Sequence, residues 1–202
     1  MKKEKKEKAE RTKRLNMPKK DERNLYIYLL AMTLVLIVAN VLSEYEIVVT
    51  GYEIALGSFV FPLVYLFSYL VTREYGKEKA LLSILIASMF QAGLYLLTVM
   101  LSTTTLDSLV ITGSIVSFLA SQIVFIFLAD SLAKTNKVSN KAALFVVYVF
   151  AILLDNLIAL MMFKSGTLHE YEMPFIISCA VKSLIAIIIT YGQYKVEGIK
   201  SK

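Results

Sequence analysis

The sequence is poor in the residues that support redox, metal and nucleotide chemistry. It contains one cysteine, Cys179, which excludes a disulfide framework within the chain. A single cysteine does not indicate whether the protein resides in an oxidising or a reducing compartment. It contains one histidine, His169, in a polar connector, so no cluster of histidine and cysteine predicts a metal site. No G-x-x-x-x-G-K-[ST] loop or G-x-G-x-x-G turn occurs, and no nucleophile–base pair stands out. We therefore expect no enzyme activity, no metal and no cofactor.

Long apolar runs are what the sequence has in their place. Hydrophobic residues make up 57% of the 202 residues, and the mean hydropathy is +0.64. These values lie outside the range of soluble globular proteins, and the longest runs match the ~20 residues that a helix needs to cross a bilayer. The sequence predicts an all-α integral membrane protein with six transmembrane helices, at about Leu25–Ser43, Ile54–Val71, Ala80–Leu101, Ser108–Leu132, Ala142–Phe163 and Met173–Tyr194.

The second of these segments is the one whose course the sequence leaves open. Gly57 and Pro62 interrupt its apolar pattern. A helix that is broken in this way often lines a binding cavity in a transporter, because irregular backbone is tolerated there. The alternative is a kink that packing against neighbouring helices absorbs.

The basic residues are distributed unevenly along the chain. Of the 22 lysines and arginines, 20 fall before the first segment, in the loops after the second and fourth segments, or after the sixth. Cytoplasmic loops carry such an excess, so we expect a multi-pass protein of the plasma membrane with both termini in the cytoplasm. The same distribution accounts for the net charge of +6 without a nucleic-acid partner. The expected organisation is a disordered basic tail at 1–23 that contacts anionic lipid, a six-helix domain at 24–195 and a short tail at 196–202.

Two opposite charges lie inside the last two segments. Asp155 is near the middle of one and Lys182 near the middle of the next. The connection at 164–172 is short enough to make the two helices antiparallel neighbours, and each charge lies roughly 12–14 Å from it. A charge inside a membrane helix costs roughly 2.5–3.5 kcal/mol on insertion scales, so we expect the two to pair. A substrate or proton-coupling site is favoured over a purely structural pair, because buried ion pairs often add little net stability.

Other polar side chains also fall inside the segments. Gln91 lies at the depth of Asp155 and Lys182, Gln122 lies deeper toward the cytoplasm, and Asn40 lies near the outer end of the first segment. An amide both donates and accepts hydrogen bonds, so each of these residues is predicted either to contact a ligand or to join two helices. A face of serines in the fourth segment favours close helix packing, at Ser114, Ser117 and Ser121.

One stretch resembles a known family. Residues 57–76 read GSFVFPLVYLFSYLVTREYG and are followed by KEKA. This resembles the signature of the queuosine precursor transporter family, also called the vitamin uptake transporter (VUT) family, in which a second helix containing Phe-Pro ends in Tyr-Gly or Phe-Gly before a basic loop. The resemblance spans roughly residues 25–195. Polar residues match the family in four helices, at Asn40, at Gln122 in SFLASQIVF, at Asp155 in ILLDNLIAL and at Lys182 in CAVKSLIA.

The resemblance implies a six-helix transporter that imports a queuosine precursor such as preQ0 or preQ1. In this hypothesis Asp155 binds the N–H edge of a 7-deazaguanine base, and Lys182 neutralises Asp155 in the empty state. Gln91 and Gln122 would supply amide contacts to the same base.

Two positions depart from the pattern of the family. Tyr69 and Phe125 stand where the family carries acidic residues. In place of two carboxylates they predict an aromatic face on which a flat ring can stack. The substrate therefore stays open between a flat heterocycle that is held by stacking and another small nutrient.

Two other functions also stay open. Substrate-capturing subunits of energy-coupling-factor transporters are small six-helix proteins without a nucleotide site, and they work only with a partner module. The third interpretation is a membrane scaffold whose basic tail recruits another protein. The expected partners are a small molecule and membrane lipid, with a second copy of the chain or an energy-coupling-factor module as further alternatives.

Overall fold

The structure is a computed structural model of the 202-residue chain. It describes residues 22–49, 51–101, 108–134, 141–162 and 168–200. The predicted tail at 1–23 therefore lies outside the described residues, apart from Glu22 and Arg23, which belong to the first described helix.

Five long helices account for most of the described residues, and each coincides with one of the predicted apolar segments. Each contains a stretch of 20 or 21 residues that is long and apolar enough to cross a membrane. Large apolar side chains remain exposed on their outer surfaces, which is the pattern of helices that face lipid. The described chain is thus that of a helical, multi-pass membrane protein. The five helices are α2 (Glu22–Leu42), α5 (Lys77–Leu101), α6 (Ser108–Lys134), α7 (Lys141–Met162) and α8 (Leu168–Lys200).

The beginning of the second predicted segment is not helical. Ile54 lies in a strand, because β1 (Glu46–Val49) and β2 (Tyr52–Ala55) form an antiparallel hairpin in which Ile47 is opposite Ile54. The predicted beginning of this helix at Ile54 is therefore wrong, because the described chain adds a short hairpin to an otherwise helical fold. The side chain of Ile54 is 3% exposed, so this strand residue packs inward although the predicted helix would have begun there.

The rest of that segment is a broken helix. It consists of α3 (Gly57–Val60) and α4 (Pro62–Tyr75), and neither piece is long enough to be counted with the five long helices. Phe61 between them keeps helical dihedral angles, with φ −52° and ψ −40°. Pro62 causes the break, because proline has no N–H to donate to the carbonyl of Ser58.

The last helix is longer than predicted. α8 begins at Leu168 and continues to Lys200, through most of the predicted C-terminal tail at 196–202. Part of the predicted connection at 164–172 is therefore helical, and residues 163–167 lie outside the described part of the chain.

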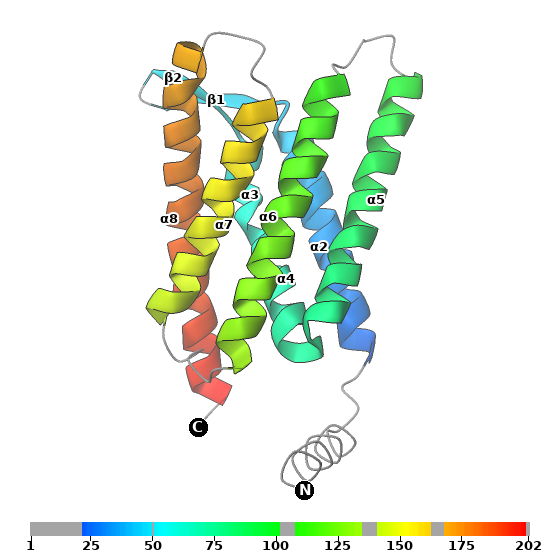
Figure 1. Ribbon diagram of the computed structural model, residues 1–202, viewed down its shortest axis with the longest axis vertical. Coiled ribbons are helices and arrows are strands. Elements are labelled where there is room, and N and C mark those ends of the chain that lie inside the picture. Colours follow the sequence, from blue (N-terminus) through cyan, green and yellow to red (C-terminus); the bar gives the residue numbers. More distant parts are fainter. Residues whose placement is uncertain (1–21, 50, 102–107, 135–140, 163–167, 201–202) are drawn as a thin grey trace, which may run out of the picture.

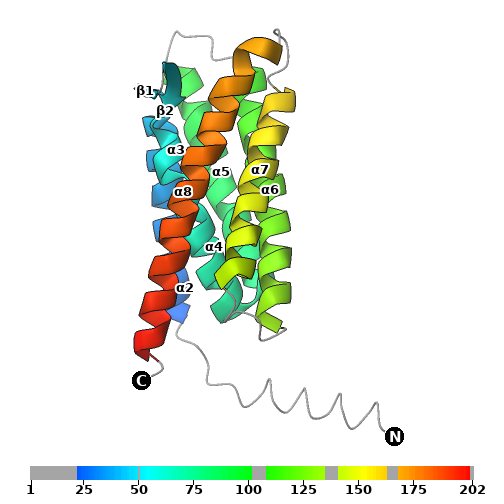
Figure 2. The same cartoon turned by 90° about the vertical axis from the view of Figure 1, so that its left-hand side faces the viewer.

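The elements run along the long axis of one bundle (Figure 1). α2 begins and α8 ends at the same end, and the β1–β2 hairpin lies at the other end. α3 and α4 together lead from the hairpin toward the opposite end. Figure 2 shows α8 along the length of the bundle between α3 and α7, and it contacts both of them. We call these two ends the hairpin end and the opposite end.

A single residue joins α4 to α5 at the opposite end. Gly76 has a φ of 87°, which lies in the left-handed region that glycine adopts without steric cost. Its N–H donates to the carbonyl of Thr72, and its own carbonyl accepts from the N–H of Ala80. The chain therefore reverses within one residue, and α4 and α5 pack as an antiparallel pair.

Aromatic rings fill the centre of the bundle. Neighbouring rings meet edge to face with centroids 5.0–6.4 Å apart. Such pairs are worth roughly 0.5–1.5 kcal/mol each beyond the area that they bury. These rings come from α4, α6, α7 and the break between α3 and α4. We call them the aromatic cluster: Phe61, Tyr65, Phe118, Phe125 and Tyr148.

Candidate functional site

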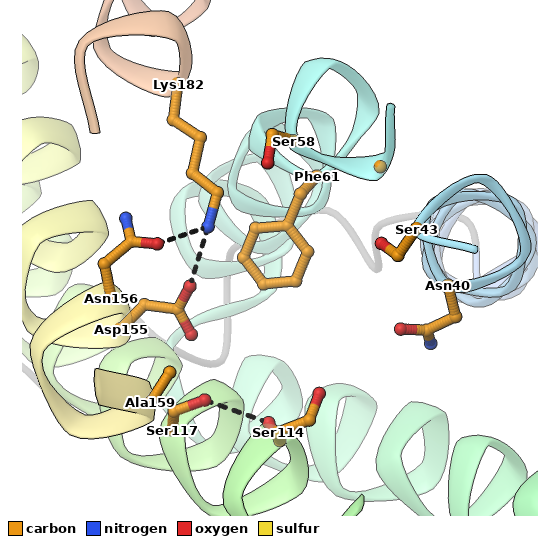
Figure 3. A pocket seen from close by; sticks show the side chains of 11 residues that line it. Asn40, Ser43, Ser58, Phe61, Ser114, Ser117, Asp155, Asn156, Ala159 and Lys182 are labelled. Atoms are coloured by element: carbon orange, nitrogen blue, oxygen red, sulfur yellow. Dashed lines mark hydrogen bonds and ion pairs between the residues drawn. The ribbon is translucent and has the colours of Figure 1, made fainter. Parts of the chain in front are cut away.

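A polar pocket of about 150 Å³ lies in the half of the bundle nearer the hairpin, among helices that are otherwise apolar. Asp155 and Asn156 of α7 and Lys182 of α8 form one side of it, and Asn40 and Ser43 lie across from them (Figure 3). Serine hydroxyl groups from α3 and α6 line the remainder. The pocket therefore brings together side chains from both ends of the sequence.

The two predicted charges meet in this pocket. The Lys182 Nζ atom donates to Oδ2 of Asp155 at 3.3 Å and to Oδ1 of Asn156 at 2.8 Å (Figure 3). The three residues are only 6–9% exposed. The amide of Asn156 is held in place in turn, since its Nδ2 donates to the carbonyl of Ile152 at 2.9 Å. The shorter contact of the ammonium group is thus to a neutral amide, and only one carboxylate oxygen is engaged by lysine.

The broken helix supplies a third contact of the ammonium group. Lys182 Nζ lies 5.0 Å from the centroid of the Phe61 ring, which is within the range of a cation–π interaction. In α3, the hydroxyl of Ser58 lies 3.2 Å from that of Ser178 in α8. The break at Pro62 therefore presents an aromatic face and a hydroxyl group to the pocket, and it ties α3 to α8.

Gly57 allows α3 to approach α2 at the edge of the pocket. A Cβ atom at this position would overlap the side chain of Ser43 and the carbonyl of Ala39. The absence of a side chain thus lets the backbone of α3 pack directly on α2. This contact sets the distance from Ser58 in α3 to Asn40 in α2 and to Ser43 in the turn that follows α2.

The size and polarity of the pocket limit what it can hold. A volume of about 150 Å³ equals that of an engineered cavity that binds one benzene molecule. One carboxylate and one ammonium group cancel in charge, and amide and hydroxyl groups offer both donors and acceptors. The pocket thus suits a ring-sized, polar molecule that presents donors and acceptors side by side.

The structure separates the other predicted contacts from this pocket. Of the predicted set, Asn40 lines the pocket with Asp155 and Lys182. Gln122 lies elsewhere and accepts a hydrogen bond of 2.7 Å from Ser68. The two predicted aromatic contacts, Phe125 and Tyr69, do not line the pocket either. The ring of Phe125 is buried in the aromatic cluster, and Tyr69 in α4 is 1% exposed.

Gln91 reaches the pocket only through an intermediate. The hydroxyl of Tyr95 lies near the side chains of Gln91 and Ser114, and Ser114 lines the pocket. The serine face of α6 is likewise divided. Ser114 and Ser117 line the pocket, whereas Ser121 accepts a hydrogen bond of 3.0 Å from the hydroxyl of Tyr65 in the aromatic cluster.

Eight lining residues are not among the predicted contacts, and four of these are Asn156, Phe61, Ser58 and Ser43. Asn156 carried a usable signal, because it is an amide next to an intramembrane charge. Phe61 carried another, since it precedes the proline of an interrupted helix. Ser58 and Ser43 carried none, because isolated serines are common in membrane helices.

No three side chains of His, Cys, Asp or Glu converge as metal ligands in the described part of the chain. Comparisons of the chain with family models, curated proteins and solved structures found no match. The geometry of the pocket is therefore the basis on which a function is assigned.

Proposed function

We propose that this chain is a membrane transporter that carries a small, planar, polar heterocycle through the pocket at Asp155 and Lys182. The observation that carries the proposal is the ion pair, in which two atoms 3.3 Å apart lie in a polar pocket among helices apolar enough to span a membrane. A pair that served cohesion alone would need no pocket beside it, and apolar side chains would often stabilise the bundle as well. Intramembrane charges commonly mark substrate pathways.

The contacts give each residue a role in this proposal. Lysine engages Oδ2 of Asp155, so Oδ1 is the acceptor for N–H donors of the ligand. Lys182 donates to a ligand carbonyl, and Asn156 keeps the ammonium group hydrogen-bonded when the ligand displaces it from the carboxylate. Phe61 offers a face for the ring, and Asn40 offers an amide from across the pocket.

The proposed topology has six passes, with α3 and α4 together as the second pass. Its support is the charge distribution. Lys77 and Lys79 begin α5 at the end where α2 starts and α8 ends, whereas Glu46 and Glu53 lie in the hairpin (Figure 1). By the positive-inside rule, the opposite end and both termini face the cytoplasm. The pocket then lies in the outer half, where a nutrient arrives.

The substrate that we propose is a queuosine precursor, preQ0 or preQ1, in line with the resemblance of residues 57–76 to that transporter family. A 7-deazaguanine offers adjacent N–H donors to a carboxylate and a carbonyl to an ammonium group. Its two fused rings exceed a volume that matches one benzene molecule. Binding therefore requires α3 or the side chains at the rim to move outward.

Ligand-induced thermal stabilisation tests the site directly. Purified protein is heated with preQ0, preQ1, queuine, guanine or single-ring vitamins, and a ligand at about 100 times its Kd is expected to add ~2.7 kcal/mol of stability. We expect stabilisation by the deazaguanines, loss of it in Asp155→Asn, and no change in Ser131→Ala, an exposed position on α6. Stabilisation that persists in Asp155→Asn would remove this residue from the site. Stabilisation by a vitamin alone would mean that the substrate is that vitamin and not a deazaguanine.

Uptake by the purified protein alone in liposomes tests the mode of action. We expect accumulation of labelled preQ1 without any partner protein. Uptake that requires an added ATPase module would instead identify a capturing subunit of an energy-coupling-factor transporter. Removal of residues 1–21 provides the second control, since a transporter should keep most of its uptake whereas a scaffold with a recruiting tail should lose its function.

A further inference from the structure

A second group of polar side chains is buried nearer the opposite end of the bundle. The hydroxyl of Ser68 donates to Oε1 of Gln122 at 2.7 Å, and Nε2 of Gln193 donates to the hydroxyl of Tyr148 at 3.2 Å. The two pairs adjoin, because the ring of Tyr148 packs against that of Phe125, which lies one turn from Gln122 on α6. Tyr69, which follows Ser68 in α4, is buried beside them. We use the name Gln122 cluster for five residues from four helices: Ser68, Tyr69, Gln122, Tyr148 and Gln193.

Three polar atoms of the Gln122 cluster have no hydrogen-bond partner among the residues that the structure describes. They are the hydroxyl of Tyr69, Nε2 of Gln122 and Oε1 of Gln193. The side chains of Tyr69 and Gln122 are 1% and 0% exposed. Buried polar groups are nearly always paired in native proteins, because an unpaired one has lost its hydrogen bonds to water without replacement. Three such atoms in one cluster, two donors and one acceptor, indicate a position for a small polar molecule.

The Gln122 cluster is separate from the pocket at Asp155. Tyr148 precedes Asp155 by seven residues on α7, and Gln193 follows Lys182 by eleven on α8, which places them roughly 10–16 Å farther toward the opposite end. The aromatic cluster links the two polar sites, because Phe118 lies one turn before Gln122 on α6, on the side of the pocket, and Phe125 lies one turn after it. Its first ring, Phe61, lines the pocket, and its last ring, Tyr148, belongs to the Gln122 cluster. The two polar sites therefore follow one another along the bundle, and the rings of Phe61, Tyr65 and Phe118 lie between them.

We propose that the Gln122 cluster is a second binding station, which receives the transported molecule after it leaves the pocket at Asp155 and the aromatic rings part. This inference rests on the proposed function. None of the five side chains carries a charge, so the station suits a neutral molecule that offers both an acceptor and a donor, such as the lactam edge of a heterocycle. The charged pocket selects the molecule, and the uncharged station holds it weakly enough for release.

Tyr69→Phe tests the station, because it removes a hydroxyl that bonds to no described residue and changes little else. The variant chain is reconstituted in liposomes, labelled preQ0, which is neutral, is added outside, and the initial rate of uptake is compared with that of the wild-type chain. Loss of one hydrogen bond in transit is expected to lower this rate about tenfold. The Kd of preQ0 for the purified protein, set by the pocket at Asp155, is expected to change less than twofold. Gln193→Met should behave in the same way, and Tyr26→Phe, at an exposed tyrosine of α2, should do nothing.

The melting temperature of the ligand-free protein gives a second measurement that does not depend on transport. If a molecule such as water pairs with the hydroxyl, Tyr69→Phe lowers the melting temperature or leaves it unchanged. A higher melting temperature together with wild-type uptake would show that the hydroxyl is merely unpaired, and this would overturn the station. Failure of the wild-type protein to bind or take up preQ0 or preQ1 would instead overturn the proposed function, and with it the station as a site for that substrate.

Discussion

At the scale of single residues, the site depends on how the ammonium group of Lys182 is accommodated. It has a carboxylate at 3.3 Å, an amide at 2.8 Å and an aromatic face at 5.0 Å, and these come from two different elements of the fold. The pairing with Asp155 could be predicted, because two antiparallel helices with a short connection place residues of equal depth opposite each other. The role of Asn156 could not, because adjacent residues on a helix point about 100° apart and the rotation of α7 about its axis is set by packing.

Removal of one charge should destabilise the protein more than removal of both. Lys182→Met leaves Asp155 buried without a cation, and such a loss typically costs ~3–5 kcal/mol in the free energy of unfolding. The double variant Lys182→Met with Asp155→Leu leaves no buried charge and should regain most of that stability. Unfolding of the single and double variants in detergent measures the difference. Equal destabilisation of the two would mean that packing, not charge, accounts for the loss.

Three predicted contacts that came from the resemblance do not line the pocket, and they show how far a resemblance in sequence can predict a binding site. Gln122, Tyr69 and Phe125 were grouped with Asp155 because they occupy corresponding positions in the family's sequence pattern. The structure instead assigns Phe125 to the aromatic cluster, and it places Gln122 and Tyr69 in the Gln122 cluster, which is nearer the opposite end than the pocket is. Depth along each helix follows from residue counting, but which side chains share a cavity depends on the tilt and rotation of several helices at once.

At the scale of elements, the pocket depends on the broken helix. Gly57 and Pro62 were recognised as interruptions, and the sequence left a break and a kink equally open. The structure has a break, with α3 and α4 on either side of Phe61. The hairpin before it was not predicted. Residues 52–55 continue the apolar pattern of the segment, and their pairing with residues 46–49 depends on tertiary structure and not on a local sequence signal.

A side chain at position 57 should separate α3 from α2. Gly57→Ala places a methyl group against the carbonyl of Ala39, and since backbone cannot move aside as a flexible side chain can, α3 must shift. We expect a lower melting temperature and at least tenfold weaker binding of preQ1. Gly93→Ala is the matched control, because a Cβ atom there meets nothing within 4 Å; alanine in place of a helical glycine should add roughly 0.5–1 kcal/mol of stability. Unchanged binding in Gly57→Ala would contradict the close packing.

Restoration of the backbone hydrogen bond across the break should affect transport more than stability. Pro62→Ala supplies the N–H that the carbonyl of Ser58 lacks, and it joins α3 to α4 as one continuous helix. The free energy of unfolding is expected to stay the same or to rise, whereas uptake of preQ1 into liposomes is expected to fall severalfold because α3 moves less easily. Wild-type uptake in a stabilised Pro62→Ala variant would show that movement at the break is not required.

At the scale of the whole molecule, length and hydropathy were enough to locate the five long helices. Apolar segments of at least 20 residues leave few alternatives when every backbone group must be paired within the helix. The second pass is different. A strand replaces its beginning and a proline divides the remainder, so neither α3 nor α4 alone is long enough to span a membrane. Its crossing follows from the topology that we propose and needs its own experiment.

Cysteine labelling across the second pass tests this topology. In a Cys179→Ala background, one new cysteine is placed by Glu53→Cys in the hairpin and another by Glu78→Cys in the first turn of α5; both positions are exposed. We expect a membrane-impermeant maleimide to label the first in intact cells and the second only after permeabilisation. The reverse pattern would invert the orientation. Labelling of both in intact cells would mean that α3 and α4 do not cross.

The one-residue connection at Gly76 has a mechanical consequence. Two helices joined by a single residue cannot slide past each other along their axes, so a shift of α4 along the bundle also moves α5, which packs against it. α4 begins at the break beside the pocket, so a movement of α4 is passed on to α5, which carries Gln91 and Tyr95. A ligand in the pocket would thereby displace the lipid-facing side of α5, which is distant from any residue that touches the ligand.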